Sequence, residues 1–113
     1  MTLFILLVAF AFGVQEPIYE GGPGITLPTP VREVKPQYTP RAMQERVQGR
    51  VILQCVVNSN GIPTAVEVRE SLHPELDLQA VKALEQWEFK PGTREGKPVA
   101  VRVHVEMTFT LKQ

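Results

Sequence analysis

The chain has 113 residues and carries twelve Lys and Arg against twelve Asp and Glu, so its formal net charge is zero. Its length fits one domain, and 43% hydrophobic residues are typical of a globular protein. Without a basic block, the composition argues against a nucleic-acid partner. A single cysteine, Cys55, excludes an internal disulfide and indicates no particular redox compartment.

The N-terminal run from Leu3 to Val14 is almost wholly apolar. It is shorter than the roughly 20 residues that span a bilayer, and it suits the hydrophobic part of a secretory signal. Ala9 and Ala11 supply the small residues of a cleavage site, although no Lys or Arg precedes the run. We expect residues 1–14 to be a signal peptide or a short membrane anchor, with a buried core helix as the remaining alternative.

Prolines and glycines interrupt residues 15–35, which predicts a Pro/Gly-rich linker. The domain is expected to occupy residues 36–113. Thr39 and Pro40 favour a helix start, as cap and first helical residue, and Gly49 favours its end.

Two strands and a second helix are expected next. Alternation over residues 50–58 predicts a strand, Asn58 to Gly61 a hairpin turn, and residues 63–71 the returning strand. Apolar residues at helical spacing over residues 76–86 predict the second helix, which ends before Trp87.

The clearest pattern is strict alternation from Val99 to Leu111, which predicts one long strand with a buried face and a wet face. This strand is longer than the other two, so we expect part of it to overhang them and present an unpaired edge. The residues expected to form that edge are Val101, Arg102, Val103, His104, Val105 and Glu106. The element order predicts an α+β fold, in which a three-stranded antiparallel sheet has two helices packed on one face, in the order α-β-β-α-β.

Several short motifs occur in order between Pro36 and Leu111. They are Pro36-Gln37-Tyr38 followed by Ala42, Gln48-Gly49-Arg50-Val51, Val57-Asn58-Ser59-Asn60-Gly61, Leu76-Asp77 with Ala80-Val81, Trp87-Glu88-Phe89-Lys90-Pro91-Gly92, Gly96-Lys97-Pro98-Val99 and the final Phe109. Together, at this spacing, they resemble the C-terminal domain of TonB, the energy transducer of Gram-negative outer-membrane transport. The residues that match the family motif are Pro36, Tyr38, Gly49, Gly61, Trp87, Phe89 and Pro91.

The resemblance implies a periplasmic binding module that is exported by an N-terminal signal or tethered to the inner membrane. Its expected partner is an extended segment of a TonB-dependent outer-membrane receptor, paired with an edge of the sheet during energy-coupled uptake. Inner-membrane motor proteins would be further partners of a tethered chain. The alternative is a structural or self-associating envelope domain that uses the same edge to form a strand-paired homodimer.

No residue pattern indicates catalysis, so we expect no enzyme, no catalytic residue and no cofactor. His104 and Glu106 share a strand face, but a zinc site usually needs at least three protein ligands, so no metal is expected. Cys55 falls on the inward face of its strand and is expected to be a small core residue. Trp87 is likewise expected to belong to the core.

Overall fold

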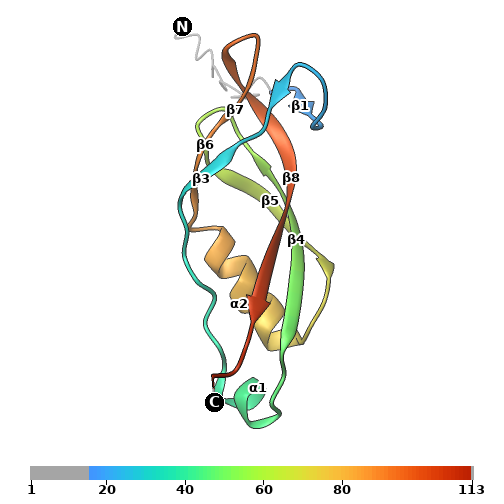
Figure 1. Ribbon diagram of the computed structural model, residues 1–113, viewed down its shortest axis with the longest axis vertical. Helices are drawn as coiled ribbons and strands as arrows, with labels where there is room; N and C mark the ends of the chain where they lie inside the picture. Colours follow the sequence, from blue (N-terminus) through green and yellow to red (C-terminus); the bar gives the residue numbers. More distant parts are fainter. Residues whose placement is uncertain (1–15, 113) are drawn as a thin grey trace, which may run out of the picture.

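The computed structural model describes residues 16–112, so the expected signal or anchor at residues 1–14 lies outside the described residues. Its elements are β1 (Ile18–Tyr19), β2 (Ile25–Thr26), β3 (Thr29–Arg32), α1 (Pro40–Gln44), β4 (Gly49–Val57), β5 (Pro63–Glu70), α2 (Pro74–Leu84), β6 (Glu88–Lys90), β7 (Gly92–Arg94) and β8 (Lys97–Phe109). The long strand β8 runs down the middle of the molecule (Figure 1), and α2 packs against β4 and β5 of the same sheet.

Both helices begin with a capping side chain followed by a proline. The Thr39 hydroxyl accepts the backbone N–H of Ala42, and Pro40 is the first residue of α1. In α2, the Nδ1 atom of His73 accepts the backbone N–H of Glu75, and Pro74 is the first residue. The sequence therefore predicted the start of α1 correctly, whereas a histidine cap on α2 was not foreseen.

The centre of the fold is the antiparallel set β5–β4–β8, as the alternation predicted. Nine consecutive residues of β4 pair with β8 without a register shift, from Gly49 opposite Phe109 to Val57 opposite Val101. The pairing of β4 with β5 contains two register shifts, and Ala65 has a φ of +50° in that region. Val66 packs against the core but Val68 is exposed, because these shifts break the alternation of β5.

One apolar core lies on a single face of this sheet. It joins Val51, Leu53 and Cys55 of β4 to α2, and Ala42 of α1 reaches the same cluster. Met107 and Phe109 close the core at the end of β8. The two helices therefore contribute to one face of the sheet, as expected.

The sheet is larger than the predicted three strands. Residues of the expected linker form β1, β2 and β3, which pair respectively with β8, β7 and β6. The main sheet thus has six strands, the β1–β8 pair is parallel, and β3 with β6 forms a separate two-stranded sheet. The segment lacks any periodic pattern because its strands have only two to four residues. The predicted domain boundaries stay a prediction.

Candidate functional site

The outer edge of β8 is the candidate site. From Val101 to Phe109, β4 occupies one edge of β8. Among the described residues, no strand pairs with the other edge from Arg102 to Phe109. The pairing of β7 with β8 reaches only Val99, and the pairing of β1 with β8 reaches only Val101. The expected edge residues Arg102 to Glu106 therefore lie on a free edge, and Val101 is paired.

The overhang that the sequence predicts is not what leaves this edge free. The part of β8 that extends beyond β4 is its beginning, and β7 and β1 pair with it there. The edge is free further along because, from Arg102 to Phe109, β4 pairs with one edge of β8 and no described strand pairs with the other. Position at the border of the sheet, and not overhang, leaves the backbone groups unpaired.

The free edge consists of particular backbone groups. Asn58 follows β4 directly and donates its backbone N–H to the carbonyl of Ile62 across the β4–β5 hairpin. The backbone N–H and C=O groups of even-numbered residues of β4 therefore point toward β5. The backbone groups of odd-numbered residues of β4 then point toward β8, where Cys55 lies opposite Val103. We infer that Arg102, His104 and Glu106 direct their N–H and C=O groups to the free edge.

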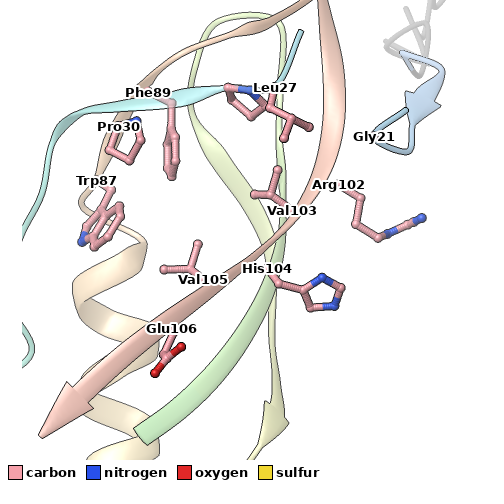
Figure 2. A pocket seen from close by; sticks show the side chains of 11 residues that line it. Gly21, Leu27, Pro30, Trp87, Phe89, Arg102, Val103, His104, Val105 and Glu106 are labelled. Carbon is pink, nitrogen blue, oxygen red and sulfur yellow. The ribbon is translucent and has the colours of Figure 1, made fainter. Parts of the chain in front are cut away.

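A groove of about 490 Å³ lies along this edge. One side is β8 from Arg102 to Glu106, and the other side consists of Leu27, Pro28, Pro30, Trp87 and Phe89, with Gly21 at one end. In Figure 2, Val103 and Val105 point toward Trp87 and Phe89, whereas Arg102 and His104 point away. An extended chain along the edge would thus have one apolar and one polar side.

The groove also changes the expected burial of β8. Met107 and Phe109 are buried as predicted, but Val103 and Val105 are only half-buried because they line the groove. Ala100, expected on the wet face, is buried. The strand itself spans Lys97–Phe109, so Leu111 lies beyond it.

Charged side chains flank the polar side. Arg102 pairs with Glu20, from the segment that follows β1. Glu106 lies 3.8 Å from Arg50, which is also 3.8 Å from Glu70. All these groups are at least partly exposed, so the ion pairs position side chains more than they stabilise the fold.

Trp87 has two roles. Its Nε1 donates to the carbonyl of Val34 at 2.9 Å, and its ring lies 5.8 Å from that of Phe89. The expectation of a core tryptophan is therefore only partly right, because the half-buried ring also lines the groove. Sequence reasoning missed Leu27, Pro28 and Pro30 altogether, since nothing in a Pro/Gly-rich segment indicates a groove wall.

Several family-motif residues hold the frame together. A Cβ on Gly61 would lie 1.9 Å from the carbonyl oxygen of Phe89, and Phe89 donates its N–H to Gly61. Pro91 lies beside the same glycine. This contact fixes β6, and with it one wall of the groove, to the β4–β5 hairpin.

The other motif residues act at the opposite end of the sheet. The Tyr38 hydroxyl donates to the carbonyl of Val47 at 2.6 Å, and its ring meets Phe109 edge-on at 5.4 Å. Gly49 adopts a φ of +145° against Leu72. Pro36 lies beside Tyr38 at the surface near the end of β8.

Cys55 is a core residue, as the sequence predicts. Cys55 is fully buried, and desolvation raises the pKa of its thiol to about 11. Within residues 16–112, no three His, Cys, Asp or Glu side chains gather as a metal site would require. Of the two helices in this part of the chain, neither is long and apolar enough for a bilayer crossing.

Known proteins show the same domain. A family model described as "Gram-negative bacterial TonB protein C-terminal" matches residues 34–111. The chain is 40% identical over 77 residues to Protein TonB of Xanthomonas campestris pv. campestris. The matched region covers 67% of this chain and 34% of that protein. It is 31% identical over 81 residues to Protein TonB of Vibrio cholerae, covering 71% of this chain and 33% of that protein.

The fold agrees with this relationship. The solution NMR structure of the TonB C-terminal domain of Pseudomonas aeruginosa superposes with a TM-score of 0.64 at 24% identity, covering 88% of this chain and 97% of that one. The chain spans about a third of the length of the two curated relatives. It belongs to the TonB C-terminal domain family.

Proposed function

We propose that this chain is a periplasmic binding module that engages outer-membrane transport receptors by adding an extended receptor segment to the free edge of β8. The supporting observation is a regular, unpaired edge beside an apolar groove. Backbone hydrogen bonds to Arg102, His104 and Glu106 would supply affinity, and alternate side chains would supply specificity.

The groove restricts which segments fit. Side chains on one side of the added strand would meet Val103, Val105 and the rings of Trp87 and Phe89. Those on the other side would meet the polar side of β8. The receptor segment should therefore alternate apolar and polar residues.

Family membership supports a wider role in energy-coupled uptake. In that role the domain would bind the receptor while a tethered chain contacts inner-membrane motor proteins. This part of the proposal depends on residues 1–14 acting as an anchor, which mass spectrometry of the mature N-terminus would test.

The binding proposal is tested with the purified chain and synthetic peptides copied from the N-terminal segments of TonB-dependent receptors of the same genome. We expect saturable binding by calorimetry. His104→Pro should weaken it roughly tenfold, because one edge N–H is lost and the added strand cannot pass the ring. The matched variant His104→Ala keeps the N–H and should bind within about twofold of the parent chain.

The alternative is self-pairing through the same edge. In that case sedimentation would show a concentration-dependent dimer that His104→Pro abolishes, and no receptor peptide would bind. Equal peptide affinity in the proline and alanine variants would contradict strand addition.

A further inference from the structure

The free edge of β8 begins where a strand of the chain's own N-terminal segment ends. Val101 pairs with Val57 of β4 and also with Tyr19 of β1. A strand residue has one neighbour on each side, so β1 lies on the edge that β4 leaves open. Figure 1 shows β1 beside the upper part of β8. The segment Glu16–Glu20, which contains β1, thus occupies the same edge as the proposed partner.

Few contacts hold this segment in place. The strand itself has only two residues, in parallel pairing. A carboxylate oxygen of Glu16 accepts the backbone N–H of Ser59 at 3.3 Å. Tyr19 accepts a hydrogen bond from Arg94 at 3.3 Å, and its ring lies 5.4 Å from that guanidinium. Such contacts at exposed positions are individually weak.

The segment also overlaps the proposed site. Arg102 pairs with Glu20 and at the same time lines the groove, where Gly21 forms one end. A partner strand can pair from His104 onward while β1 remains bound. Pairing that extends to Arg102 or beyond requires Glu20 and then Tyr19 to leave.

We propose that the segment Glu16–Glu20 is a displaceable internal strand that competes with the partner for the beginning of the β8 edge. This inference rests on the proposed function and concerns its regulation. Its displacement frees the edge at Ala100 and Val101 and releases Arg102 from Glu20. Partner binding is therefore weaker with the segment in place than with it removed.

Two variants move the segment in opposite directions without substituting a residue that lines the groove. Ile18 and Ala100 are register partners, so Ile18→Cys with Ala100→Cys can form a disulfide that locks β1 to β8. Cys55 is buried and does not interfere. Glu16→Ala with Tyr19→Ala removes the contacts to Ser59 and Arg94, which frees the segment.

The test measures the dissociation constant of one receptor peptide for the full chain in three forms: oxidised lock, reduced lock and freed segment. We expect the oxidised lock to bind about threefold to tenfold more weakly than its own reduced form, and the freed segment to bind more tightly by a similar factor. Equal constants in all three forms overturn the inference and leave the proposed function standing. No binding by any form overturns both.

Discussion

The main sheet has two outer edges with different designs. β5 forms one of them: its pairing with β4 slips twice, and Glu67, Arg69 and Glu70 are all exposed along it. From Arg102 to Phe109, β8 forms the opposite edge: its pairing with β4 is regular over nine residues, and an apolar groove lies beside this edge. Bulges and charges are the usual protection of a sheet edge against further pairing. The difference favours β8 over β5 as the edge for the proposed partner strand.

The largest expected effect is on stability, and it compares a backbone N–H of β8 that points to β4 with one that points to the free edge. Val103→Pro removes an N–H that we infer points to β4, and should destabilise the fold by roughly 2–4 kcal/mol in urea unfolding. His104→Pro removes one that points outward and should cost less than about 1 kcal/mol. Equal losses of stability in the two variants would show that the backbone orientation is wrong.

An intermediate effect is expected when a charge replaces an exposed apolar residue beside one edge or the other. Leu27 in the groove and Val68 on β5 are 54% and 39% exposed, so glutamate at either should change stability by only about 0.5 kcal/mol. Leu27→Glu should weaken receptor-peptide binding roughly tenfold, because it places a charge in the apolar groove. Val68→Glu is the matched control and should leave the affinity unchanged. A loss of affinity in the Val68 variant would mean that β5 also takes part.

The smallest effect lies away from both edges, where α1 meets α2. Hydrogen bonds from His73 and then Arg41 lower the pKa of Glu45 below 4.5. A carboxylate whose pKa is lower in the folded state than in the unfolded state stabilises the fold above pH 4.5. This stabilisation is lost as the pH falls through the folded-state pKa. Between about pH 6 and pH 3.5, the urea midpoint of the parent chain should fall further than that of Glu45→Gln. Parallel declines would show that this contact does not contribute.

The sequence predicted the elements whose information is local. Alternation from Val99 to Leu111 gave the long strand, displaced by two residues, and Thr39-Pro40 gave the helix start. Asn58 to Gly61 gave the hairpin because only certain residues tolerate its backbone. These signals depend on residues a few positions apart.

The missed features depend on distant pairing. Ile18 meets Ala100, and Pro30 meets Phe89, although no period or turn residue links these positions. The half-burial of Val103 and Val105 likewise depends on where residues 27–30 pass. The sequence therefore predicted which strand carries the candidate site, but not the groove wall or the internal strand on its edge.

Amide hydrogen exchange along β8, followed residue by residue by NMR, tests the central claim most directly. In the free chain, the amides of Arg102, His104 and Glu106 should exchange faster than those of Val103 and Val105, which face β4. Saturation with a receptor peptide should slow exchange at His104 and Glu106 and leave β5 unchanged. Protection along β5, or an unchanged alternating pattern in β8 when the peptide is bound, would contradict strand addition at this edge.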